Sequence, residues 1–95
     1  VDVLDVAEQL RPTIAWGQVA ATDDLEVGVW EHPVGTSTDV ETDEVFVVLS
    51  GRGRVTCADG TVLELRPGTV GILEAGTATT WEVHEPLRKV YVIRP

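Results

Sequence analysis

The sequence has a single cysteine, no methionine, few basic residues and no long apolar run. Cys57 cannot form an internal disulfide, so we expect a protein of the reducing cytoplasm. No stretch reaches the roughly 18 apolar residues of a membrane helix, and the first residues lack the pattern of a secretory leader. Seven basic residues against sixteen acidic ones give a formal charge of −9. This charge disfavours nucleic acid and anionic membranes as partners.

Helix signals are also scarce. Within the first dozen residues, Leu4, Val6, Ala7 and Leu10 can share one helical face before Pro12. This pattern predicts a short N-terminal helix or arm. No helical pattern follows it.

The remainder of the chain consists of short segments rich in β-branched residues, separated by turn residues. Asp59-Gly60 and Pro67-Gly68 are turn signals, and the first of them is typical of a tight hairpin. We expect a loop from Pro33 to Thr38. The expected strands cover residues 13–20, 25–31, 45–49, 54–57, 61–65, 70–73, 77–83 and 87–93. About eight short strands in 95 residues predict one all-β domain, residues 1–95, with a jelly roll favoured.

The stretch from Thr42 to Arg54 contains the strongest strand signal, residues 45–49, which Gly51 and Gly53 follow. Its composition predicts a strand buried on both faces. Glu44 and Phe46 share a face with Val48, and we expect this face to line the interior of a barrel.

Apolar residues on the opposite faces of the strands have no obvious cover in a domain of this size. They are Val27, Val29, Val45, Val47, Leu49, Val90 and Val92. Such faces predict a homodimer that forms by sheet packing or strand exchange.

Two spacings resemble the motifs of the cupin family. Glu44, six residues and Gly51 match the second half of the first motif, and Gly68, five residues and Glu74-Ala75-Gly76 match the frame of the second. The chain therefore resembles a small single-domain cupin, of the subgroup with ureidoglycine aminohydrolase-type and ethanolamine-utilisation-type members. The resemblance implies an RmlC-like jelly-roll barrel, a double-stranded β-helix, that binds a small molecule in its lumen.

The metal ligands of the family are largely missing. Metal-binding cupins carry His-x-His before the glutamate, and those positions hold either Thr38 and Val40 or Ser37 and Asp39. The histidine of the second motif falls at Thr79. Transition metals bind tightly to imidazole or thiolate, so we expect no metal site and no cofactor.

Oxygen ligands are nevertheless plentiful near the barrel mouth. Asp39, Glu41, Asp43 and Glu44 form either a solvated acidic loop or an acidic rim. Such a rim leaves weak binding of Mg²⁺ or Ca²⁺ open. The two histidines, His32 and His84, are expected in turns or at the surface.

The candidate binding residues follow from strand parity and from the resemblance. They are Trp30, Glu44, Phe46, Thr79, Trp81 and Tyr91. For the tryptophans, including Trp16, the alternative is a structural place in the core. Lys89 shares a face with Tyr91 and is expected either to pair with the acidic rim, to balance Glu44, or to hold a carboxylate ligand.

The sequence favours a cupin that binds a small organic molecule in its lumen. Two alternatives stay open. One is a hydrolase or isomerase of a small polar metabolite that uses Glu44 as acid or base. The other is a non-catalytic regulatory module whose lumen the tryptophans close. Cys57, with no histidine nearby, is expected to be structural.

Overall fold

The computed structural model describes residues 15–21 and 24–94 and contains seven strands. They are β1 (Ala15–Ala21), β2 (Glu26–His32), β3 (Gly35–Val40), β4 (Asp43–Cys57), β5 (Val62–Leu65), β6 (Val70–Leu73) and β7 (Ala78–Arg94). The described residues contain no helix, so no helix among them could span a membrane. The predicted N-terminal helix lies outside the described residues. The all-β prediction is confirmed.

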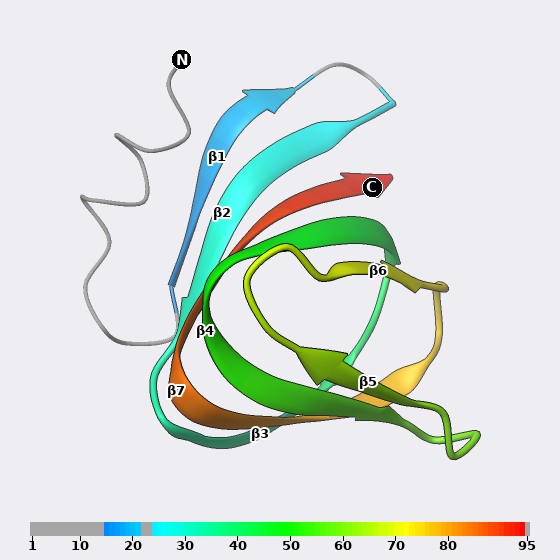
Figure 1. Cartoon of the computed structure of the whole chain (residues 1–95). Helices are drawn as coiled ribbons and strands as arrows, with labels where there is room; N and C mark the ends of the chain where they lie inside the picture. The colour runs from blue at the N-terminus through cyan, green and yellow to red at the C-terminus, as the bar shows by residue number, and fades with distance from the viewer. Residues whose placement is uncertain (1–14, 22–23, 95) are drawn as a thin grey trace.

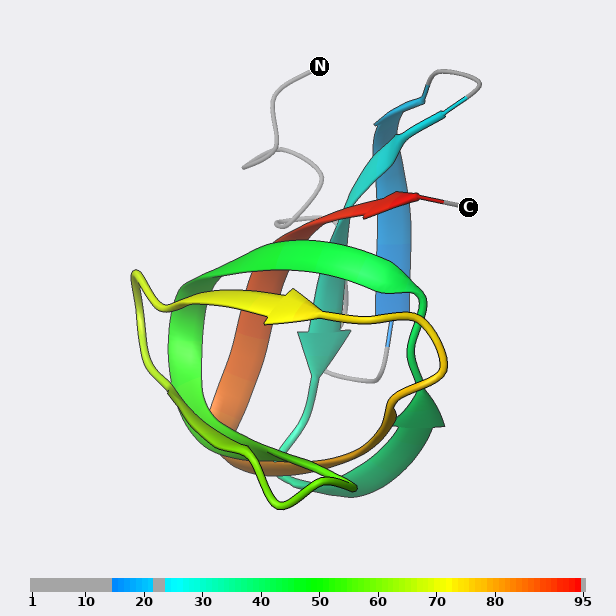
Figure 2. The ribbon, with the colours of Figure 1, turned by 90° about the vertical axis from the view of Figure 1, so that its right-hand side faces the viewer.

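Two long strands, β4 and β7, form the frame of the barrel. They pair antiparallel from Asp43↔Arg94 to Cys57↔Thr79, and both curl around the interior (Figures 1 and 2). The first half of β4 also pairs with β6 and the second half with β5. The C-terminal half of β7 pairs with β2, and its N-terminal half pairs with β3. This antiparallel arrangement is the jelly-roll barrel that the sequence predicts.

The strand prediction is wrong in three places. The predicted strands 45–49 and 54–57 are one continuous strand, β4, because residues 50–53 also pair with β7. Residues 35–40 form β3 instead of a loop, because Ser37 and its neighbours pair with β7 around Trp81. The expected break at residues 84–86 is absent, and β7 passes through Pro86 without ending. The register between β4 and β7 shifts opposite this point, between Ser50 and Gly53. A proline is tolerated there because a bulge does not need every ladder hydrogen bond.

The core lies inside the barrel and follows strand parity. Phe46 and Val48 are almost fully buried, whereas Val45 and Val47 on the opposite face of β4 are exposed. The expectation that this strand is buried on both faces is therefore wrong for the single chain. The other core side chains are Val55, Leu65, Leu73, Trp81, Val83, Leu87 and Tyr91.

Candidate functional site

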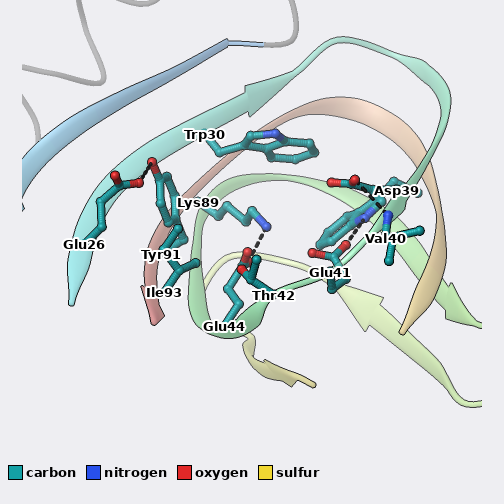
Figure 3. A pocket seen from close by; sticks show the side chains of 11 residues that line it. Glu26, Trp30, Asp39, Val40, Glu41, Thr42, Glu44, Lys89, Tyr91 and Ile93 are labelled. Atoms are coloured by element: carbon teal, nitrogen blue, oxygen red, sulfur yellow. Dashed lines mark hydrogen bonds and ion pairs between the residues drawn. The ribbon is translucent and has the colours of Figure 1, made fainter. Parts of the chain in front are cut away.

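Side chains of β2, β7 and β4 meet in rows across the inner face of the sheet. Register places Lys89 between Trp30 and Val48, and Tyr91 between Gly28 and Phe46. A pocket of about 240 Å³ lies at this end of the barrel (Figure 3). Its wall is made of Glu26, Trp30, Asp39, Val40, Glu41, Thr42, Glu44, Trp81, Lys89, Tyr91 and Ile93.

A buried ion pair occupies the inner wall of the pocket. The Nζ atom of Lys89 donates to Oε2 of Glu44 at 2.5 Å, and both side chains are less than a tenth exposed. The same nitrogen lies 4.6 Å from the ring centroid of Trp30, 4.7 Å from that of Phe46 and 4.3 Å from that of Trp81. The ammonium group therefore sits in a cage of three aromatic rings, where cation–π attraction adds to the charge of the carboxylate.

Burial moves the pKa values of the two partners toward each other. Desolvation raises the pKa of Glu44, and the neighbouring ammonium of Lys89 only partly opposes this. Desolvation lowers the pKa of Lys89, and attraction to Glu44 opposes that change. Both shifts favour the neutral forms, an amine and a carboxylic acid, relative to the same groups in water.

Glu41 forms a second buried polar cluster beside this pair. Its backbone is held by hydrogen bonds with Gly76 and Thr77, which fix the loop between β3 and β4. Its Oε1 atom accepts hydrogen bonds from Oγ1 of Thr79 at 2.7 Å and from Nε1 of Trp81 at 3.2 Å. These bonds orient the indole ring that forms part of the cage around Lys89.

At the outer end of the pocket, the position of the Tyr91 ring requires a glycine at residue 28. A Cβ atom at Gly28 would overlap the hydroxyl end of Tyr91, so a side chain there would displace the phenol ring. With glycine in place, the Tyr91 hydroxyl donates to Oε2 of Glu26 at 3.1 Å. Burial and this carboxylate raise the pKa of Tyr91, which keeps the phenol protonated.

Four of the six predicted ligand-binding residues line the pocket, namely Trp30, Glu44, Trp81 and Tyr91. Phe46 and Thr79 lie behind the wall: the Phe46 ring packs against Trp81, and Thr79 is bonded to Glu41. Whether any of the six contacts a ligand stays a prediction.

Three pocket residues are more central to the site than the sequence indicates. Lys89 is central to the site, and strand parity with Tyr91 already indicated its inward direction. The acidic sequence around Glu41 fits a solvated loop as well as an acidic rim, but this side chain is 8% exposed. Glu26 shares the inner face of β2 with Trp30, and this parity was the available signal.

The prediction for His32 is wrong. This side chain is 3% exposed, and its Nε2 atom lies 2.8 Å from Oγ of Ser37. The ring is buried because it packs against Trp30, with 5.3 Å between ring centroids. His84 is exposed, as expected, and Cys57 packs against the core.

The residues of this barrel do not fit the metal site of histidine-ligated cupins. Pairing with Trp81 and Thr79 places Ser37 and Asp39 on the inner face of β3, and neither offers an imidazole. The carboxylate of Glu44 is bonded to Lys89. Among residues 15–21 and 24–94, no group of three or more His, Cys, Asp or Glu side chains could hold a metal ion.

Comparison with known proteins identifies the family. A family model, the EutQ-like cupin domain, matches residues 19–91. A protein of unknown function from Rhizobium leguminosarum has a TM-score of 0.85 at 24% identity, with 100% of this chain and 94% of that one covered. The Clostridium difficile EutQ protein has a TM-score of 0.77 at 20% identity, with 86% and 68% covered. A DUF861-family protein from Thermotoga maritima is 31% identical, with a TM-score of 0.61 and 66% and 73% covered. No curated protein is significantly similar. The chain belongs to the EutQ-like cupin family.

Proposed function

We propose that the protein binds a small organic cation in the pocket at the barrel mouth. The pocket wall carries four carboxyl groups, those of Glu26, Asp39, Glu41 and Glu44, against the single amino group of Lys89. Only Glu44 among the four pairs with a cation within the described residues. The three remaining carboxyl groups carry the proposal, because they attract a positively charged ligand and repel an anionic one.

The size and aromatic lining of the pocket support the same class of ligand. Drug-sized ligands occupy roughly 300–1,000 Å³, so about 240 Å³ suits a smaller metabolite. Trp30 is half-buried and contributes an indole ring to the wall. An ammonium group next to this ring, with Glu26 or Asp39 nearby, would gain both cation–π and charge attraction.

Tryptophan fluorescence provides the test. Choline should quench the emission saturably, and its uncharged isostere 3,3-dimethylbutanol should bind at least about fivefold more weakly, since the cation contributes on the order of 1 kcal/mol or more. Acetate should not bind. Glu41→Gln should weaken the binding of choline, whereas Glu64→Gln, which alters an exposed carboxylate paired with Arg54, should not. Equal affinity for choline and its isostere, or no binding of either, would overturn the proposal.

A second candidate is acid–base catalysis by Glu44 on a small polar metabolite. The burial that raises the pKa of Glu44 favours it, because a raised pKa brings the carboxyl group closer to the range in which acid–base catalysis is efficient. If the protein were a non-catalytic regulatory module, we would expect the tryptophans to close the lumen. The open pocket gives that alternative no support.

A further inference from the structure

We propose that Lys89 is a nucleophile that forms an imine with a small aldehyde or ketone bound in the pocket. This inference rests on the proposed function in one respect, which is that the same pocket admits the ligand. It adds a reaction class, a reacting atom and a role for the Glu44 carboxyl group.

Lys89 is the only lysine in the sequence, and it is buried. The other six basic residues are arginines, and Arg52, Arg54 and Arg88 have side chains 40–61% exposed. Lys89, in contrast, is 3% exposed. Lysine is almost never fully buried without a specific partner, and solubility does not need it there. Its amine, unlike a guanidinium, can lose a proton and become a nucleophile.

The surroundings of the Nζ atom also favour a nucleophilic amine. Three aromatic rings surround it and the side chain is 4% exposed, and Lys89 lines a pocket with room for a small molecule. Catalytic lysines that form imines are activated by this kind of desolvation. Burial lowers the pKa of Lys89 and raises that of Glu44, so the amine and the carboxylic acid become accessible together.

The Glu44–Lys89 pair supplies the proton transfers that the reaction needs. Glu44 takes a proton from the ammonium, and the free amine adds to the carbonyl carbon. The carbonyl oxygen takes that proton from Glu44, and the nitrogen returns one of its own to Glu44. Glu44 then protonates the hydroxyl group, which leaves as water as the nitrogen lone pair forms the C=N bond. The iminium ion carries the same charge as the original ammonium, and the same carboxylate and rings stabilise it.

The pocket charge restricts the substrate class. Glu26, Asp39 and Glu41 would repel a carbonyl compound that carries a carboxylate or phosphate. A carbonyl compound that is uncharged or carries an ammonium group meets no such repulsion. Betaine aldehyde combines an aldehyde with a quaternary ammonium group, and choline is its counterpart without a carbonyl group. The two probes separate imine formation from binding.

Reductive trapping tests the proposal. The protein is incubated with betaine aldehyde, treated with borohydride, and analysed by intact mass and peptide mapping. We expect one borohydride-dependent label per chain at Lys89, formed faster than on Nα-acetyl-lysine amide in the same tube. Glyoxylate should label Lys89 no faster than this reference. Lys89→Arg keeps a cation in the cage and should take no label. Glu44→Gln should slow labelling by about 100-fold or more, as expected for loss of an acid–base group.

The outcomes separate the two proposals. Saturable quenching by choline without a label on Lys89 would overturn imine formation and leave the binding proposal in place, as would a label confined to the N-terminal amine. A label on Lys89 without choline binding would overturn the binding of cations and support imine formation. Near-ultraviolet circular dichroism of each variant establishes that it is folded before it is compared.

Discussion

At the scale of single residues, the unusual feature is an ion pair inside a small core. The attraction between Lys89 and Glu44 has to offset the removal of both charges from water, and the three rings around Nζ contribute to that offset. A pair of this kind stabilises the fold little in comparison with two apolar residues. The presence of this buried ion pair is easier to explain if the amine or the carboxyl group takes part in a reaction.

Removal of one partner should be costly. Lys89→Met leaves the Glu44 carboxylate buried and unpaired, and we expect the free energy of unfolding to fall by about 3–5 kcal/mol. The control is Arg54→Met, which removes an exposed pair with Glu64 and should cost about 1 kcal/mol or less. Urea titrations of both variants measure the difference. Equal losses would show that the buried pair behaves like a surface pair.

The decrease in the free energy of unfolding caused by Lys89→Met should depend on pH. Without the ammonium, burial and the neighbours Glu41 and Asp39 act together to raise the pKa of Glu44 above its ordinary value of 4.5. The folded state then binds more protons than the unfolded state, so stability falls as pH rises through the folded pKa and is fully recovered below 4.5. The double variant Lys89→Met/Glu44→Gln should lack this dependence. If the difference in the free energy of unfolding between Lys89→Met and the parent protein does not change with pH, this prediction is wrong.

At the scale of elements, the curvature of β4 depends on Gly51. This residue has a φ of 94°, and a Cβ atom there would overlap the carbonyl oxygen of Pro86 on β7. The glycine therefore allows the two frame strands to approach each other where their register shifts. Glu44 and Lys89 both lie on one side of this shift, where residues 43–48 of β4 pair with residues 89–94 of β7 in regular register.

Gly51→Ala should separate the effect of close packing from the effect of backbone conformation. The matched control is Gly60→Ala, at a φ of 92° with no atom within 4 Å of the added Cβ. We expect about 1–2 kcal/mol of destabilisation at Gly60, from the backbone conformation alone. At Gly51 the overlap with backbone should add about 1–3 kcal/mol more. Urea titration of both variants measures the two changes in the free energy of unfolding. Equal changes would show that the contact with Pro86 is not important.

The elements that the sequence predicted are those specified by local signals. Period-two alternation places Phe46 and Val48 inward, and the turn at Gly60 separates two strands correctly. Strand β3 was missed because its Thr and Ser residues form a strand only through pairing with β7. The contact between Lys89 and Glu44 joins residues 45 positions apart, and local patterns carry no information on the register that creates it.

At the scale of the whole molecule, the outer face of the sheet carries an apolar surface. Val45 pairs with Ile72 and Val47 with Val70, and all four side chains are exposed, Ile72 by 76%. The surface continues across β7, because Val45 and Val47 also pair with Val92 and Val90. A chain with a formal charge of −9 would otherwise present this apolar strip to water.

We expect a second copy of the chain to cover this surface in a symmetric dimer, since a contiguous apolar face that matches itself is the common basis of such interfaces. Ile72→Glu should convert the dimer to a monomer in sedimentation equilibrium, because each interface would then bury two carboxylates. The control is Val62→Glu on β5, where an exposed valine lies outside the strip, and this variant should remain dimeric. A parent protein that sediments as a monomer at micromolar concentration would refute the dimer directly. Dissociation by both variants would instead place the effect in the added charge and not in the surface.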